Sequence, residues 1–179
     1  MPGLSNSYLE VLCRALTGES FFGVTPCDML PSLVEKALVQ CEKFSVIVNT
    51  APSTVPQGHF IGLSFNGSDS KCLFFDSLAL KTTYRVVDPN IQLAINMLKS
   101  RYPKTLVVEV KNPLQSLEAS SMCGFYAAAF ILSQDVRVEE KFEDFVARYT
   151  APKNNLIAND KIAVNYIIEF IHLFGVKKK

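Results

Sequence analysis

The chain has 179 residues, of which 49% are hydrophobic and 20% are charged, and its formal net charge is +1. This hydrophobic share excludes a disordered chain, and the balanced charge argues against a strongly basic nucleic-acid binder. The apolar stretches are shorter than the ~18 residues that a membrane span needs, and residues 1–10 lack the pattern of a signal peptide. We therefore expect one globular, intracellular domain over residues 1–179.

Helical and strand patterns follow one another along the chain. Residues 5–16 and 31–40 have the spacing of helices, and the intervening segment 17–30, with two glycines, a proline and an aromatic pair, is typical of an ordered loop. The later elements, in chain order, are expected to be strands at 44–50, 59–65, 71–77 and 105–110, a helix from Pro89 to before Pro103, and helices at 123–134, 139–149 and 159–174.

Three of these segments carry information about tertiary structure. The continuous β-branched run 44–50 suits a strand that is buried on both faces, and the apolar, alanine-rich segment 123–134 suits a buried central helix. Asn66-Gly67 predicts a hairpin that brings residue 59 opposite residue 76 or 77. Strands in the middle and helices at the ends favour an α+β fold.

Five cysteines and two histidines limit the possible chemistry. An odd cysteine count excludes a fully paired disulfide framework, and no two cysteines have a C-x-x-C spacing. A zinc site would need three scattered cysteines or several carboxylates beside His59 and His172. A cysteine–histidine enzyme would have ten formal pairings to choose from.

Cys123 is the best candidate nucleophile, because it begins a long predicted helix directly after a polar loop. The dipole of a helix N-terminus favours a thiolate, and Gly124 would leave space for a substrate backbone. The alternative for any of the cysteines is a small buried hydrophobe. His59 is the better candidate base, since it begins a strand after a loop, whereas His172 suits a cation at a helix C-terminus or a packing residue.

Two further residues complete a catalytic hypothesis. Asp76 ends the strand predicted to pair with that of His59 and would orient its imidazole, although it also suits a turn or a cap. Gln115 precedes Cys123 in the polar loop and would donate its side-chain amide to an oxyanion, together with the Cys123 N–H group. A loop glutamine on its own is usually a solvated surface residue.

The order His59, Asp76, Gln115, Cys123-Gly124 resembles that of adenain, the adenovirus maturation protease, and of its relatives in other DNA viruses and virus-like elements. The deSUMOylating ubiquitin-like-protein proteases share this order, which is the opposite of that in papain. The resemblance covers roughly residues 10–135. It is carried by the segments SFFGVTPCDMLP, SVIVNTA, GHFIGLSF, KCLFFDSLAL and LQSLEASSMCGFY.

The resemblance implies a papain-like α+β fold. Its central mixed, largely antiparallel sheet would be flanked by helices, with Cys123 at the N-terminus of a buried helix. It further implies a monomeric cysteine endopeptidase that cleaves viral capsid or core precursors after small, glycine-containing motifs. Cys123 would be the nucleophile, His59 the base, Asp76 its orienting group and Gln115 an oxyanion donor. No metal or organic cofactor is expected, and the implied location is the virion and the host nucleus.

This sequence departs from the adenain pattern in three respects. Phe60 stands where the family usually has tryptophan, and Asp76 stands where adenain has glutamate and the deSUMOylating relatives have aspartate. Residues 77–122 contain no cysteine, so a disulfide-linked peptide activator is not expected, whereas another peptide or DNA activator stays open. The net charge of +1 favours at most a weak DNA association.

Two other functions are compatible with the same residues. One is a deubiquitinating or deSUMOylating hydrolase that uses the same triad, although 179 residues leave little for a separate ubiquitin-docking surface. The other is an inactive protease-like module that only binds partners.

Overall fold

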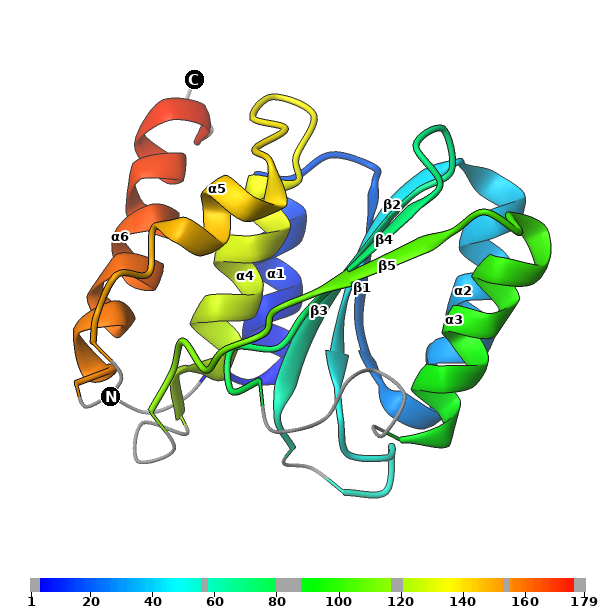
Figure 1. Ribbon diagram of the computed structural model, residues 1–179, viewed down its shortest axis with the longest axis horizontal. Helices are drawn as coiled ribbons and strands as arrows, with labels where there is room; N and C mark the ends of the chain where they lie inside the picture. The colour runs from blue at the N-terminus through cyan, green and yellow to red at the C-terminus, as the bar shows by residue number, and fades with distance from the viewer. Residues whose placement is uncertain (1–3, 56–57, 80–87, 117–120, 153–154, 176–179) are drawn as a thin grey trace.

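The computed structural model describes residues 4–55, 58–79, 88–116, 121–152 and 155–175. A five-stranded sheet lies between two layers of helices (Figure 1). Helices α2 (Leu30–Gln40) and α3 (Pro89–Arg101) cover one face. The helices on the other face are α1 (Asn6–Leu16), α4 (Cys123–Ser133), α5 (Phe142–Ala147) and α6 (Ile157–Phe174).

The strands pair in their sequence order. They are β1 (Phe21–Pro26), β2 (Lys43–Asn49), β3 (Phe60–Asn66), β4 (Lys71–Phe75) and β5 (Leu106–Glu109). Pairing is antiparallel from β2 to β4, whereas β1 and β5 join their neighbours in parallel. The predicted mixed α+β fold is therefore confirmed, with the antiparallel part confined to the three central strands.

The segment 17–30 is not a loop, and this prediction was wrong. It contains the edge strand β1 and a short 3₁₀ helix, η1 (Cys27–Met29). The register of β1 is irregular between Phe21 and Val24, where Gly23 has a φ of 124°. An edge strand tolerates a glycine irregularity and a terminal proline, which are the same features that mark a loop in sequence.

Helix α4 forms the centre of the layer that carries the candidate site. Nearly all of its residues are buried, as its apolar sequence predicts, and it packs against β3. The contact is close, because a Cβ on Gly62 would lie 2.3 Å from Cδ1 of Phe130. Strand β2 is buried on both faces from Phe44 to Asn49, which confirms the interpretation of its continuous β-branched run.

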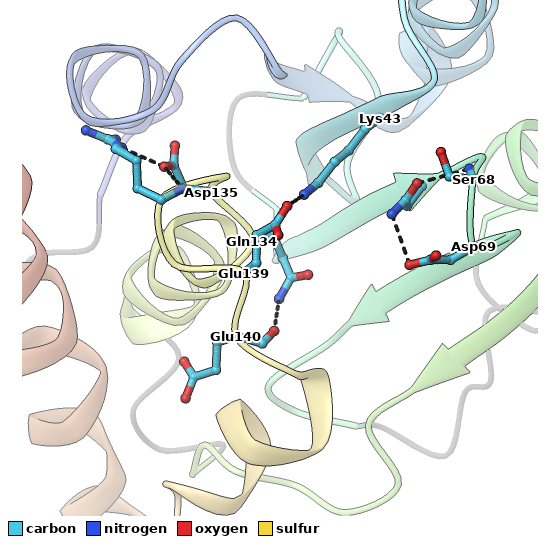
Figure 2. Close-up of polar contacts among 9 residues, drawn as sticks. Lys43, Ser68, Asp69, Gln134, Asp135, Glu139 and Glu140 are labelled. Atoms are coloured by element: carbon cyan, nitrogen blue, oxygen red, sulfur yellow. Dashed lines mark hydrogen bonds and ion pairs between the residues drawn. The ribbon is translucent and has the colours of Figure 1, made fainter.

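The connection between α4 and α5 is anchored to the sheet at the C-terminal end of α4 (Figure 2). Lys43 and Glu139 form an ion pair at 2.6 Å, and Nε2 of Gln134 donates to the carbonyl of Glu140 at 3.2 Å. Glu139 has a φ of 46°, so this segment is not helical and α5 starts at Phe142 rather than at residue 139. These contacts lie at the opposite end of α4 from Cys123.

All five cysteines are free thiols. Within the described part of the chain, no helix has both the length and the apolar character to cross a bilayer. In the same residues, no three histidine, cysteine or acidic side chains gather closely enough to hold a metal ion.

Candidate active site

His59 lies directly before β3, where the end of β2 holds its backbone. Its N–H group donates to Oγ1 of Thr50 at 3.1 Å, and its carbonyl accepts from the N–H group of Thr50 at 2.8 Å. The preceding Gly58 has no room for a side chain, because a Cβ there would lie 2.1 Å from Oδ1 of Asn49. The backbone of His59 is therefore fixed on both sides before its side chain makes any contact.

Asp76 follows β4 and binds the imidazole. Nε2 of His59 lies 2.7 Å from Oδ1 of Asp76, and the same oxygen accepts from the N–H group of Leu78 at 2.9 Å. A carboxylate only accepts hydrogen bonds, so Nε2 carries the hydrogen and Nδ1 is the nitrogen left for a thiol. The second donor fixes the carboxylate independently of the histidine.

The predicted hairpin is correct, but its predicted register is not. Gly62 pairs with Phe75, so continuing the ladder puts Asp76 opposite Ile61 rather than opposite His59. His59 lies two residues before Ile61 and directly before the first residue of β3. The contact of His59 with Asp76 is therefore diagonal across the ladder, a distance that longer side chains reach.

Cys123 is the first residue of α4, and its side chain faces the imidazole. Cys123 is 5% exposed. Burial lowers the pKa of His59, but hydrogen bonds with Asp76 and Cys123 and the charges of both raise it more, so the pKa reaches about 9. At neutral pH the imidazole is therefore protonated. Among the described residues, no side chain caps the N-terminus of α4.

Gly124 does not leave space for a substrate, contrary to the prediction. A Cβ on Gly124 would lie 3.2 Å from Cβ of Leu4 and 3.3 Å from Cδ1 of Leu9. Phe60 lies 3.5 Å from the same point. The glycine suits the close approach of α1 and its preceding residue to α4, because even a methyl group here would require Leu4 and Leu9 to shift.

Gln115 is buried, with 1% of its surface exposed, and is not the solvated residue that a loop glutamine usually is. Its Oε1 accepts from the hydroxyl of Ser77 at 2.7 Å, and its backbone N–H donates to the carbonyl of Ser77 at 3.0 Å. Because the amide oxygen is engaged in this way, the NH₂ group is the end of the side chain that can serve an oxyanion.

The other candidates lie elsewhere. His172 is exposed in the last turn of α6, so the prediction that it lies at a helix C-terminus is confirmed. Cys13, Cys27 and Cys72 are buried and Cys41 is partly exposed. Burial raises the pKa of Cys13 and of Cys72 to about 12, which suits inert thiols.

Sequence reasoning missed Thr50 and Ser77, which hold His59 and Gln115 in place. Each directly adjoins a recognisable feature: Thr50 ends the run 44–50, and Ser77 follows Asp76. Their hydrogen bonds join segments that are distant in sequence, so no local pattern identifies their partners.

No protein-family model and no curated protein matches this sequence. Solved structures do match. The Chlamydia abortus effector protein ChlaDUB is 13% identical over 100% of this chain and 96% of its own, with a TM-score of 0.59. The C-terminal Ulp1 protease domain in complex with Smt3, the yeast ortholog of SUMO, is 11% identical over 94% of this chain and 77% of its own, with a TM-score of 0.53.

A further structure is the SUMO protease Ulp1 with its catalytic cysteine oxidised to a sulfinic acid. It is 11% identical over 92% of this chain and 79% of its own, with a TM-score of 0.53. At such identities the likeness concerns the fold alone. The chain shares its fold with the SUMO protease Ulp1, and this likeness does not single out adenain.

Proposed function

We propose that this chain is a cysteine peptidase in which Cys123, His59 and Asp76 form the catalytic triad and Gln115 an oxyanion donor. The proposal rests on the position of the His59 imidazole between two groups. Its Nε2 lies 2.7 Å from the carboxylate of Asp76, and the ring also interacts with the thiol of Cys123. The likeness in fold to a structure whose cysteine is named catalytic supports it.

The proposed reaction uses these groups in turn. The Cys123 thiolate attacks a carbonyl carbon, and the NH₂ group of Gln115 with the N–H group of Cys123 stabilises the oxyanion that forms. The imidazolium of His59 gives its proton to the leaving amine, and a thioester remains on Cys123. Water then attacks the thioester while His59 takes a proton from it, which releases the carboxylic acid and regenerates the Cys123 thiolate beside the imidazolium. These steps need no metal or organic cofactor.

The substrate class that the neighbours support best is a ubiquitin-like protein joined through its C-terminus. One of the similar structures is a SUMO protease in complex with yeast SUMO, so the deubiquitinase or deSUMOylase alternative has more support than cleavage of viral precursors. The viral alternative, a location in the virion or the nucleus, a peptide or DNA activator and a weak DNA association stay predictions.

Electrophilic probes test this proposal. Ubiquitin and SUMO that carry a C-terminal vinyl methyl ester are expected to form a covalent adduct with the wild-type protein, located at Cys123 by mass spectrometry. Cys123→Ala should abolish the adduct, whereas Cys41→Ala, which removes the partly exposed thiol, should not.

An adduct that survives Cys123→Ala would refute the assignment of the nucleophile. Cleavage of Gly-Gly-containing peptides without any probe adduct would favour the endopeptidase that adenain resemblance implies. No adduct and no cleavage under either condition would favour the inactive module.

A further inference from the structure

The peptide unit between Leu114 and Gln115 is held from both sides. Its N–H group, that of Gln115, donates to the carbonyl of Ser77 at 3.0 Å. Its carbonyl, that of Leu114, accepts from Nδ2 of Asn159 at 2.9 Å and from the hydroxyl of Tyr126 at 3.2 Å. Because a peptide unit is planar, fixing both ends fixes the direction in which the chain enters Gln115.

Leu114 packs into the core cluster that includes Tyr126, and hydrogen bonds add to this packing. Residues 111–113 are exposed, and the segment 108–114 lines a cavity of about 560 Å³ between β5 and helices α5 and α6. Nothing in that segment before Leu114 is buried. Leu114 and Gln115 are the first buried residues after β5, and the peptide unit that joins them is the one held by hydrogen bonds.

Of the two side chains that donate to the carbonyl of Leu114, Asn159 is the more firmly held. It is 1% exposed, lies in the first turn of α6, and engages both ends of its amide, since Oδ1 also accepts from the N–H group of Ala151 at 3.0 Å. Tyr126 has one hydroxyl hydrogen and two acceptors, the second being Oδ1 of Asp160 at 3.0 Å. The Tyr126 hydroxyl hydrogen is shared between two acceptors, whereas the NH₂ group of Asn159 donates to the carbonyl of Leu114.

We propose that Asn159 is a positioning residue that sets the oxyanion amide of Gln115 relative to the Cys123 thiol. Tyr126 connects the Cys123 helix to the peptide unit before Gln115. It lies one helical turn after Cys123 on α4, and its hydroxyl donates to the carbonyl of Leu114. Helices α4 and α6 pack side by side (Figure 1), so the helix that carries the thiol and the helix that carries Asn159 hold one peptide unit together. This inference rests on the proposed function.

The test is a double-mutant cycle on the full chain, with a fluorogenic ubiquitin-like or Gly-Gly substrate. Asn159→Asp keeps an acceptor for Ala151 and loses the donor to Leu114. We expect kcat to fall about tenfold with KM changed by less than about twofold, and Gln115→Ala to reduce kcat about 100-fold. Asn165→Asp, the same change at an exposed position of α6, should have wild-type activity.

The double variant separates positioning from a general structural effect. If Asn159 acts through Gln115, Asn159→Asp should cause no further loss in the Gln115→Ala background. The rate of alkylation of Cys123 by iodoacetamide at pH 7 should stay within about twofold of wild type, because that reaction forms no oxyanion. Tyr126→Phe, which removes only a hydroxyl, should give the same pattern with a smaller loss and covers the case in which Asn159→Asp does not fold.

Losses that multiply in the double variant, or slower alkylation in either single variant, would overturn the positioning role. A wild-type protein without turnover would instead contradict the proposed function itself. The two failures are therefore distinguishable.

Discussion

Replacing Asp76 by asparagine should lower the pKa of His59. The substitution keeps the shape of the side chain and an oxygen that can accept from His59 at 2.7 Å and from the N–H group of Leu78 at 2.9 Å. It removes the negative charge and replaces the second carboxylate oxygen by an NH₂ group. Burial of the imidazole, which lowers the pKa of His59, is then opposed by Cys123 alone.

The size of the effect follows from the pKa of His59, which is raised from 6.5 to about 9. At about 1.4 kcal/mol per pKa unit, this shift is worth about 3 kcal/mol, and Asp76→Asn should remove a large part of it. A raised histidine pKa stabilises the fold fully below pH 6.5 and loses that effect as the pH rises through 9. The stability difference between wild type and variant should therefore be largest near pH 6 and should shrink by pH 10.

The titration can be followed by NMR on the imidazole Cε1–H groups. The chain has only two histidines, and His172→Gln assigns their signals. We expect His59 to titrate near pH 9 in the wild type and towards pH 6.5 in Asp76→Asn, with urea denaturation at both ends of the pH range as a second measurement. A wild-type His59 that titrates at or below 6.5, or titration curves that coincide in the two proteins, would refute the electrostatic argument.

Three further substitutions test neighbouring contacts. Ser77→Ala removes the hydroxyl that holds Gln115, so kcat should fall about tenfold while KM changes little; a changed KM alone would speak against this role. Thr50→Val leaves the N–H group of His59 without its acceptor and should cost about 1–3 kcal/mol in urea denaturation, which Thr50→Ser should restore. Gly62→Ala puts a Cβ 2.3 Å from a phenylalanine ring of α4 and should cost about 1–3 kcal/mol, so an unchanged denaturation midpoint would contradict the close packing of α4 on β3.

Local patterns predict the elements that carry the candidate site. The Asn-Gly turn identifies the β3–β4 hairpin, and the apolar composition of residues 123–134 identifies the buried helix α4. The register of the hairpin depends on the turn, in which Ser70 takes a φ of 51°. The side chains of His59 and Asp76 nevertheless meet at 2.7 Å, so their contact was predicted correctly although the register was not.

Tertiary contacts account for what the sequence did not predict. Gly124 follows a candidate nucleophile, which suggests substrate access, but its neighbours are Leu4 and Leu9, about 115 residues earlier in the chain. The edge strand β1 is defined by pairing with β2 rather than by its own composition. Gln115 looks like an ordinary loop residue until its contact with Ser77, 38 residues away, is known.

The end of β4 connects both halves of the candidate site. Asp76 binds the imidazole of His59, and the next residue, Ser77, binds the side chain and backbone of Gln115. A displacement of this short segment would move His59 and Gln115 together. The distance between these two side chains would then change less than their distances to Cys123. The distances to Cys123 depend on the position of α4, whose Tyr126 donates to the carbonyl of Leu114 directly before Gln115. Two adjacent residues after β4, Asp76 and Ser77, therefore position His59 and Gln115. The packing of α4 against α6 positions Cys123 relative to them.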